Sequence, residues 1–389
     1  MNRIHRRFGF FAAVVIAASL TPNASAQLTC PVLTNTTRIA AQSSGDVQTV
    51  RANAFPCEWG ISSSETWIFT ERIENQARIT VLANPGAAPR TGTISIFPVN
   101  IAATLPGVTI PVVQAGAGCG FTVNPQNVNV ASTGAVTGTA VNTNGGCTWT
   151  TAVSASWLAL PPGVDGFNGP GFLSLTAAAN GNTFPRVATS SVAGEFTQFL
   201  QKGVNTPELF ADVSVNHPFF DYITLMRTTG LTSGCTPTTY CPDRTITRAE
   251  ISVFLVRALY GLADFAYPAA PYFTDVPNTH PFFRYIQKIR QLGITLGCSD
   301  TAFCPDDLVT RATGATLVVR ARLATSSQFA HPVNPLFTDV PFGDTFFGAI
   351  QKAKQLGITS GCTATTYCPT SYLTRGQAAV FIIRGLMTQ

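Results

Sequence analysis

The sequence predicts a multidomain chain in which two all-β sandwiches are followed by an all-α bundle of three helix-loop-helix repeats. Short segments of alternating polarity occur twice in the N-terminal half, which is typical of strands. Segments of helical periodicity occur three times in the C-terminal half. All ten cysteines fall into local pairs. Only 11% of the residues are charged, which favours folded domains over a disordered tail.

Residues 1–26 are predicted to be a secretory signal peptide. Three arginines are followed by an apolar run over residues 8–20 and by small residues at 24–26. The apolar run is too short for a stable membrane span, which needs roughly 20 residues. We therefore expect an exported protein that begins near Gln27 and resides at the cell surface, in the cell wall or on the periplasmic face of the envelope.

The charge balance excludes two classes of partner. The whole chain has a formal net charge of +5. Removal of the predicted signal peptide, with its three arginines, brings this charge close to zero. A nearly neutral chain lacks the basic surface that nucleic acids and anionic membranes attract. We expect neither partner, and no membrane span.

Residues 27–118 and 119–203 are predicted to be two related β-sandwiches. Alternating segments such as 77–82 and 91–97 are separated by turn residues, Asn84–Gly86 among them. The second stretch repeats the cysteine and tryptophan positions of the first. The tryptophans concerned are Trp59, Trp67, Trp149 and Trp157. We expect them to be core residues, although an exposed tryptophan could stack on a sugar ring.

The cysteines are predicted to form disulfides, because export exposes them to oxidising conditions. A zinc site would need closer cysteine pairs or nearby histidines. The expected pairs are Cys30–Cys57, Cys119–Cys147, Cys235–Cys241, Cys298–Cys304 and Cys362–Cys368. The last three would staple one loop in each helical repeat.

A short linker, residues 204–208, precedes repeats predicted at 209–264, 272–325 and 336–389. Each repeat has an aromatic-x-Asp-Val lead-in, a first helix closed by glycine, a cysteine-stapled loop and a second amphipathic helix. The closing glycines are Gly230, Gly293 and Gly357. One such unit buries too little surface alone, so we expect the three to share a core.

An arginine recurs at the first turn of each second helix: Arg248, Arg311 and Arg375. Its charge there opposes the helix dipole, at a cost of about 0.3–1 kcal/mol. Two explanations are open. The arginine pairs with an aspartate of a lead-in (Asp212, Asp275 or Asp339), or it helps the helix N-terminus to bind an anion. In the first repeat, Thr247 before the arginine and Glu250, three residues after Thr247, form a capping box. This role explains both residues without a ligand.

Further basic residues recur on both helices of each repeat. They are Arg227, Arg290 and Lys354 on the first helices and Arg257, Arg320 and Arg384 on the second. Most such residues are simply solvated. A groove flanked by two of these series would suit a polyanionic glycan better than a neutral one.

Catalytic motifs are absent from the sequence. It contains no zinc-protease helix motif, no nucleophile elbow and no phosphate-binding loop. We therefore expect no enzymatic activity, no catalytic residue, no metal site and no cofactor.

Two family resemblances follow from these motifs. Cys147-Thr148-Trp149, Ser156-Trp157-Leu158 and Gln201-Lys202-Gly203 resemble the BACON domain, an immunoglobulin-like module suspected of binding carbohydrate that also serves as a spacer. The repeated lead-in, the Gly-Leu/Ile-Thr-x-Gly element and the Thr-Arg-Ala-Glu motif resemble the S-layer homology (SLH) domain.

The SLH resemblance implies a pseudo-threefold helical bundle that anchors exported proteins non-covalently to cell-wall polysaccharide, often pyruvylated. In that family the arginine of the Thr-Arg-Ala-Glu motif takes part in binding, which implicates Arg248, Arg311 and Arg375. We expect these arginines and the lead-in aspartates Asp212, Asp275 and Asp339 to be the polymer-binding residues. The leading hypothesis is a cell-envelope protein held by these repeats to a cell-wall polymer linked to peptidoglycan, with the sandwiches as spacers or glycan contacts. The alternatives are a secreted carbohydrate-binding or adhesive protein acting through the sandwiches, and a self-assembling surface-layer protein.

Overall fold

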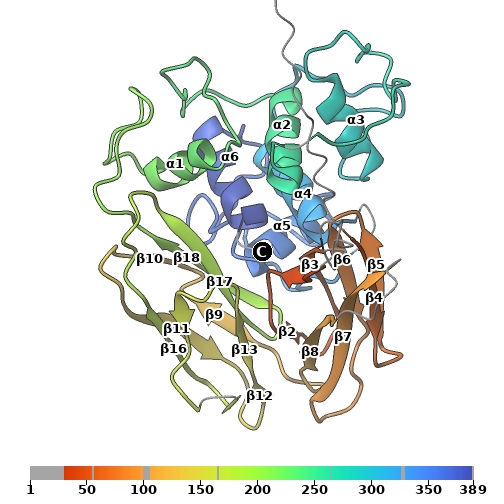
Figure 1. Cartoon of the computed structure of the whole chain (residues 1–389), viewed down its shortest axis with the longest axis vertical. Coiled ribbons are helices and arrows are strands. Elements are labelled where there is room, and N and C mark those ends of the chain that lie inside the picture. Colours follow the sequence, from red (N-terminus) through yellow and green to blue (C-terminus); the bar gives the residue numbers. More distant parts are fainter. Residues whose placement is uncertain are drawn as a thin grey trace, which may run out of the picture.

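The computed structural model describes residues 30–54, 57–99, 106–163, 166–262, 264–325 and 329–387. The predicted signal peptide lies outside the described residues. Strands occupy the described chain up to residue 201, and helices begin at residue 220. The helices lie over one end of two groups of strands (Figure 1).

The first group of strands, β region 1, contains two four-stranded sheets, with orders β1-β3-β6-β5 and β2-β8-β7-β4. Neighbouring strands are antiparallel except β2 and β8, which are parallel. The strands are β1 (Leu33–Thr34), β2 (Ile39–Ala41), β3 (Asp46–Asn53), β4 (Glu58–Ser63), β5 (Ile68–Ile73), β6 (Gln76–Val81), β7 (Arg90–Val99) and β8 (Val108–Gln114).

The second group, β region 2, repeats this arrangement with sheets β10-β18-β17-β13 and β14-β16-β11-β9 and a small pair β12-β15. Here β10 and β18 are the parallel pair. The strands are β9 (Thr122–Asn124), β10 (Asn127–Val130), β11 (Ala135–Asn142), β12 (Thr148–Trp149), β13 (Thr151–Val153), β14 (Leu158–Ala159), β15 (Phe167–Asn168), β16 (Gly171–Ala177), β17 (Arg186–Val192) and β18 (Glu195–Gln201).

Each β region encloses its own apolar core between its two sheets. Burial alternates along strands such as β7 and β8, as the period-2 pattern predicts. Strand β18 is buried throughout, because Phe196 and Leu200 also pack into the core of the helical region. Trp59 and Trp149 are 4% and 3% exposed and belong to these cores. Trp67 and Trp157 are partly buried, and the guanidinium groups of Arg90 and Arg186 lie 4.2 and 4.6 Å from their ring centroids. These tryptophans therefore have the structural role that the sequence predicts.

The helical region contains two helices for each repeat, ending in a short π-helix. They are α1 (Phe220–Thr228), α2 (Arg248–Tyr260), α3 (Phe283–Gln291), α4 (Arg311–Leu323), α5 (Phe347–Gln355), α6 (Arg375–Ile382) and η1 (Ile383–Met387). Gly230, Gly293 and Gly357 follow the first helices with φ of 77°, 70° and 69°. These left-handed values confirm the predicted glycine stops, because only glycine adopts them without strain. In the described part of the chain, no helix combines the length and apolar character of a membrane span.

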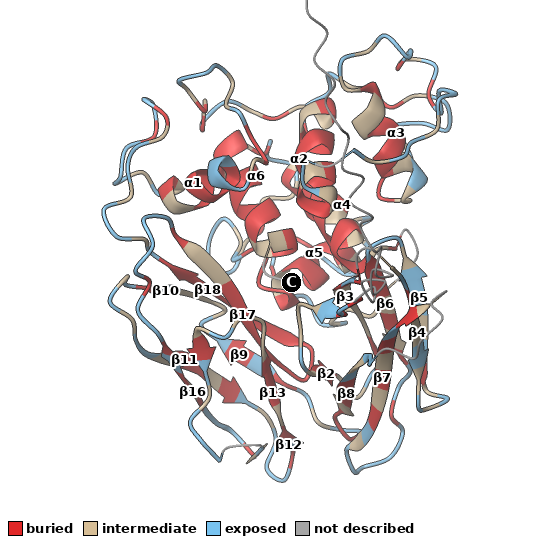
Figure 2. Ribbon diagram, viewed as in Figure 1, coloured by how far each residue is buried: buried red, intermediate tan, exposed pale blue. Residues whose placement is uncertain are grey.

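The three repeats share one core and close on one another in a ring. A single cluster of buried apolar residues runs through all six α-helices, and these helices are largely buried in Figure 2. Isolated β-bridges just before the second helices connect each pair of repeats. The bridges are Thr245 with Thr374, Thr247 with Leu308, and Thr310 with Tyr372. One unit thus completes its packing only against the other two, as expected.

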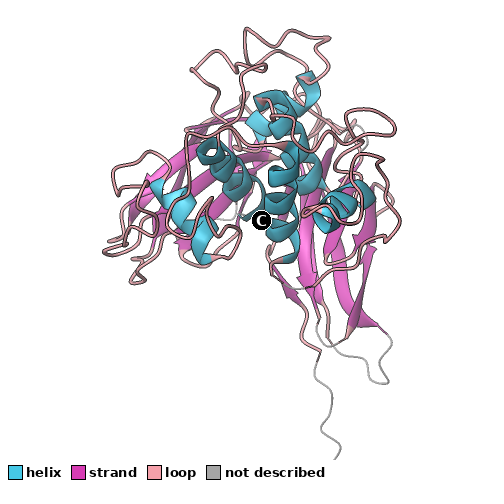
Figure 3. Cartoon of the chain, turned by 90° about the horizontal axis from the view of Figure 1, so that it is seen from above, coloured by secondary structure: helices cyan, strands magenta, loops and turns pink. Residues whose placement is uncertain are grey.

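The second helices end against β region 1, which supplies donors to their free C-terminal carbonyls. The bonds are Arg51 Nη2 to Ala258 O (2.9 Å) and Leu386 O (2.7 Å), Thr49 Oγ1 to Arg322 O (2.6 Å), and Arg78 Nη1 to Ala324 O (2.7 Å). Arginine at a helix C-terminus also complements the helix dipole. The β regions therefore pack against the helices, with strands on both sides of them when seen from above (Figure 3).

The five disulfides have the predicted pairing. Two lie in the β regions and three in the repeat loops, where each cysteine pair is separated by six positions. The second cysteine of each loop, Cys241, Cys304 or Cys368, has φ of 59°, 56° or 59°. A left-handed backbone is strained for a residue other than glycine, so the surrounding contacts must hold these loops in place.

Candidate functional site

The second helices begin with the threonine caps that the sequence predicts. The side chains of Thr247 and Thr374 accept from the N3 backbone, and Glu250 and Gln377 complete both capping boxes. Thr310 makes the cap alone. Their arginines follow at the first helical position, at the end of the helices remote from β region 1.

Each of these arginines reaches the disulfide loop of another repeat. Its Nε donates to the backbone carbonyl of an aromatic residue there, and its guanidinium lies over the same aromatic ring. The Nε bonds are Arg248 to Phe303 O (2.7 Å), Arg311 to Tyr367 O (2.9 Å) and Arg375 to Tyr240 O (3.0 Å). The ring-centroid distances are 4.8, 4.9 and 4.9 Å in the same order. The arginine of the first repeat thus binds the second repeat, that of the second binds the third, and that of the third binds the first.

The backbone of the same helix starts is also occupied. The N–H groups of Arg248, Arg311 and Arg375 donate to carbonyls of the loop that each arginine contacts, at 2.9, 2.8 and 2.8 Å. The next N–H of each helix donates to the proline carbonyl of that loop. An anion at these helix N-termini would need the same N–H groups. Anion binding by the helix N-terminus, one of the two explanations open from the sequence, is therefore not supported by this geometry.

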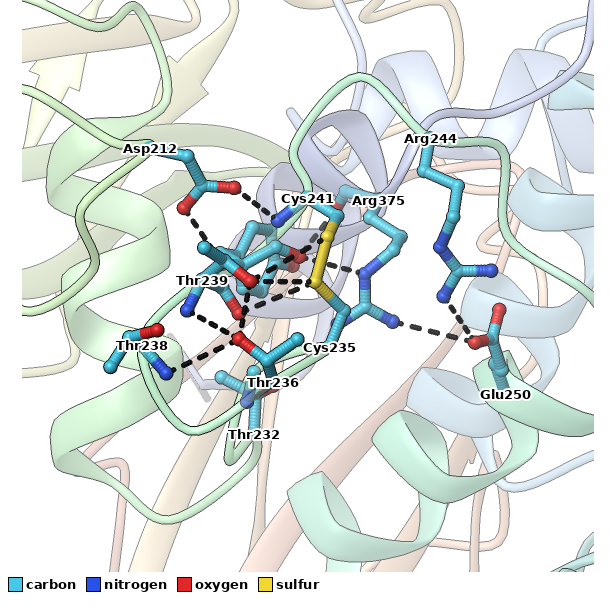
Figure 4. The surroundings of a disulfide bond; sticks show 12 residues. Asp212, Thr232, Cys235, Thr236, Thr238, Thr239, Cys241, Arg244, Glu250 and Arg375 are labelled. Atoms are coloured by element: carbon cyan, nitrogen blue, oxygen red, sulfur yellow. Dashed lines mark hydrogen bonds and ion pairs between the residues drawn. A yellow bond between two sulfur atoms is a disulfide. The ribbon is translucent and has the colours of Figure 1, made fainter.

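The aspartates of the lead-ins hold the loops and do not pair with the arginines. Both carboxylate oxygens of each aspartate accept backbone N–H groups, as Figure 4 shows for Asp212. Asp212 accepts from the N–H groups of Tyr240 and Cys241, Asp275 from those of Phe303 and Cys304, and Asp339 from those of Tyr367 and Cys368. All six distances are 2.7–2.8 Å. Among the residues that the structure describes, none of the three forms an ion pair with Arg248, Arg311 or Arg375. Pairing between the arginines and these aspartates, the other explanation open from the sequence, is therefore not found among the described residues, because the strained cysteine turn takes the carboxylate. A polymer-binding part for the aspartates stays a prediction.

The three arginines differ in their access to solvent. Arg311 and Arg375 are 5% and 4% exposed, so both are buried between the repeats that they contact. Arg375 also lies 3.7 Å from Glu250, which pairs with Arg244 as well (Figure 4). Arg248 is only partly buried, and its Nη2 is a buried donor with no partner. Burial lowers the pKa of Arg248, and nearby Asp307 and Asp275 partly offset this effect.

Arg248 lines a groove of about 590 Å³ between the second and third repeats, hereafter the interrepeat groove. Its walls are the loop 295–297, one face of α4, the start of α5 and segment 329–331. Arg320 and His331 add further nitrogen groups, and the groove-lining residues include no carboxylate. Burial also lowers the pKa of Arg320. Both arginines are thus incompletely hydrated cations, which favours an anionic ligand.

Hydroxyl and apolar groups complete the interrepeat groove. Thr313, Thr316 and Thr345 lie along it, and Leu296 is 53% exposed at its edge. Phe346 adds an aromatic face. A sugar ring offers hydroxyl groups and apolar C–H faces together, so this lining is suited to an acidic saccharide.

Two small residues open the interrepeat groove. Gly348 and Ala349 occupy positions where the second repeat has Arg284 and Tyr285. Arg284 lies 4.4 Å from the centroid of Phe265 and 5.4 Å from that of Tyr285, so large side chains fill the equivalent place. A Cβ on Gly348 would lie only 2.9 Å from the ring of His331. No motif in the sequence marks these two residues, although an alignment of the three repeats shows the contrast between Gly348 and Arg284.

Comparison with known proteins identifies the helical region. Residues 209–251, 272–313 and 336–379 each match the S-layer homology domain. "Cell surface glycoprotein 1" of Acetivibrio thermocellus is 30% identical over 156 residues, which is 37% of this chain and 6% of that protein. An "Endoglucanase" of Bacillus sp. (strain KSM-635) is 30% identical over 177 residues, which is 44% of this chain and 18% of that protein.

The chain thus spans less than a fifth of the length of these two relatives. Among solved structures, domains 5–6 of the S-layer protein SbsC are 13% identical with a TM-score of 0.19, covering 46% of this chain and 99% of that one. A TM-score this low establishes no shared fold, and the immunoglobulin-like and BACON assignments of the β regions stay predictions.

The chain is a protein with three tandem S-layer homology domains. The SLH identity predicted from the sequence is therefore confirmed.

Proposed function

We propose that this protein attaches non-covalently to an acidic cell-wall polysaccharide through the interrepeat groove. The observation that carries the proposal is the pair of partly exposed guanidinium groups, Arg248 and Arg320, in a groove whose described lining contains no carboxylate. All three arginines hold neighbouring repeats together, but Arg311 and Arg375 are buried, so we assign these two a structural part alone.

The proposed role is attachment and not catalysis. The relatives named as glycan-degrading enzymes match only a part of this chain, and the three SLH domains account for anchoring. The boundaries expected from the sequence, 27–118 and 119–203 for the β domains and 209–264, 272–325 and 336–389 for the repeats, remain part of this proposal. The packing of β region 1 on the helix ends supports a further assignment, namely that the β regions brace the helical bundle.

Leu296 offers a charge test that leaves the fold alone, since its side chain is largely exposed at the groove. In pull-downs of the full chain with purified cell-wall sacculi, Leu296→Glu should weaken binding roughly tenfold, about 1.4 kcal/mol. Leu296→Lys should keep or strengthen it, because the ligand is anionic. Ser233, an exposed residue at the same place in the first repeat, supplies the matched control Ser233→Glu, which should bind like the natural chain.

Equal binding by the glutamate and lysine variants would refute the assignment of the groove. Concentration-dependent sheet formation without any binding to sacculi would instead favour the self-assembling surface-layer alternative. Removal of the acidic substituents from the sacculi should have the same effect as Leu296→Glu, since the two changes weaken one charge interaction from opposite sides.

A further inference from the structure

The three loops closed by disulfides also hold the repeats together. Just after the second cysteine of each loop, backbone carbonyls accept the first two N–H groups of a second helix from another repeat. In the second repeat these carbonyls belong to Asp307 and Pro305, which accept from Arg248 and Ala249 at 2.9 Å each. Phe303, just before that cysteine, accepts from Arg248 Nε as well. Closure of the loop and closure of the ring of repeats therefore involve the same short segment.

The loop disulfides are more accessible to solvent than those of the β regions. Cys298 and Cys362 are exposed, and the other four loop cysteines are half-buried. In the β regions, Cys30 and Cys147 are 3% and 5% exposed, and Cys147 belongs to the core of β region 2. Disulfide exchange begins with attack of a thiolate on one sulfur, so its rate depends on access to that sulfur. A reductant in solution therefore reaches the loops before it reaches the β regions.

The disulfide and Asp275 together hold Cys304 in a left-handed conformation. Its φ is 56°, a value that is strained for a residue other than glycine. Asp275 accepts from the N–H groups of Cys304 and Phe303 at 2.7 and 2.8 Å. The disulfide joins Cys304 to Cys298 across six positions. Loss of this bond lets Cys304 relax toward an unstrained conformation, which moves the carbonyls of Phe303 and Pro305 beside it.

The interface between the first and second repeats has one hydrogen bond fewer at this place than the other two interfaces. In the other two loops a tyrosine hydroxyl donates to the backbone carbonyl of the arginine that contacts the loop. The bonds are Tyr240 Oη to Arg375 O (2.9 Å) and Tyr367 Oη to Arg311 O (2.7 Å). The second repeat has Phe303 at this position, which carries no hydroxyl group. The ring should therefore open first between the first and second repeats.

We propose that the Cys298–Cys304 disulfide is a redox switch that controls the contact between the first and second repeats. A dithiol reductant attacks Sγ of the exposed Cys298 and forms a mixed disulfide with it, and Cys304 leaves as a thiolate. The second thiol of the reductant then attacks the mixed disulfide and releases Cys298. The dithiol becomes a cyclic disulfide and supplies the two electrons and two protons of the two new thiols. The ring of repeats then opens at Arg248 and Ala249.

Reduction of this loop also disturbs the interrepeat groove, since residues 295–297 and Arg248 both line it. Release of the chain from the cell wall by a dithiol rests on the proposed function, whereas opening of the ring does not. The two events are measured separately. Amide hydrogen exchange without any ligand reports opening of the ring, and pull-downs with sacculi report release.

Timed reduction of the full chain with dithiothreitol tests the proposal, with the reacted cysteines identified by alkylation and mass spectrometry. Cys298–Cys304 should be reduced faster than Cys119–Cys147, by roughly tenfold or more. Amide exchange at residues 248–249 should then rise roughly tenfold or more, because these N–H groups lose their acceptors. Exchange at residues 311–312 and 375–376 should rise later.

Variants separate the switch from general damage by the reductant. Phe303→Tyr supplies the hydroxyl group that the other two loops have, and should slow the exchange of residues 248–249 in the reduced chain. The double change Cys298→Ser with Cys304→Ser should reproduce the fast exchange without reductant. The same change in the third repeat, Cys362→Ser with Cys368→Ser, is the matched control and should leave these N–H groups protected.

Reduction of Cys119–Cys147 as fast as that of Cys298–Cys304 would overturn the proposal, as would unchanged exchange at residues 248–249 in the reduced chain. Earlier opening at residues 311–312 or 375–376 would also overturn it, since the missing hydroxyl group of Phe303 would then not decide the order. If the double serine variant does not fold, reduction of the natural chain and of Phe303→Tyr still decides the outcome. Constant binding to sacculi after the ring has opened would contradict the proposed function alone.

Discussion

Replacement of Glu195 by glutamine should remove a pH dependence from the stability of this protein. Glu195 is buried at the junction of the β regions with the third repeat, where Lys352, Asp46 and Lys354 are the charged groups nearest to it. Loss of hydration is the largest influence and raises its pKa from 4.5 to about 7. The hydrogen bond from Gln355 and the charge of Lys352 act in the opposite direction without cancelling it.

The sign follows from proton binding. Between pH 4.5 and 7 the folded chain holds the Glu195 proton while the unfolded chain releases it. The stabilisation is therefore complete below pH 4.5 and is lost as the pH rises to about 7. At about 1.4 kcal/mol for each pH unit, the loss is roughly 3 kcal/mol. Glutamine has no proton to lose, so the variant should not show this decline.

Urea unfolding of the natural chain and of Glu195→Gln between pH 4.5 and 8 measures the effect. The free energy of unfolding of the natural chain should fall by roughly 3 kcal/mol relative to the variant over this range. Asp300→Asn, at an exposed carboxyl group, is the control and should follow the natural chain. Parallel curves for the natural chain and Glu195→Gln would refute the reasoning, since burial would then not penalise the charge.

Three further changes test other parts of the fold. Lys352→Met should cost about 3–5 kcal/mol of unfolding free energy, because it leaves Asp46, its buried ion-pair partner at 3.1 Å, without a countercharge. Tyr367→Phe should cost about 1 kcal/mol, because its hydroxyl donates to the buried carbonyl of Arg311 at 2.7 Å. Thr374→Ala should cost about 1 kcal/mol through loss of the α6 cap. Denaturant unfolding measures all three.

Matched variants separate these effects from general damage. Lys202→Met removes an exposed lysine, and Tyr372→Phe removes the hydroxyl of a tyrosine that is 55% exposed. Both should change the unfolding free energy by less than about 0.5 kcal/mol. Thr374→Ser keeps the capping oxygen and should stay close to the natural chain. Losses from these controls as large as those from the test variants would contradict the assigned contacts.

The repeats, the five disulfide pairs, the helix stops and the threonine caps could all be predicted from the sequence. The two disulfides of the β regions join residues 27 and 28 positions apart and were predicted from export and from the matching cysteine positions of the two regions. The other features depend on residues close together in the chain: Thr247 and Glu250 are three positions apart, and Cys235 and Cys241 are six apart. Short-range geometry restricts such pairs to few arrangements. The three SLH domains could be recognised for the same reason, because their motifs repeat in a constant order.

What the arginines do was decided only by the tertiary structure. Arg248 lines a groove while Arg311 and Arg375 are closed in, although the three have the same local sequence position. The segments around each arginine come from other repeats and differ in sequence: Gly348, which lines the groove with Arg248, stands where the second repeat has Arg284. Burial and pairing between segments so far apart depend on how the whole chain packs, and a local pattern carries no record of that packing. A cavity of about 1000 Å³ between both β regions and the third repeat, built from three distant segments, could be seen only in the folded chain for the same reason.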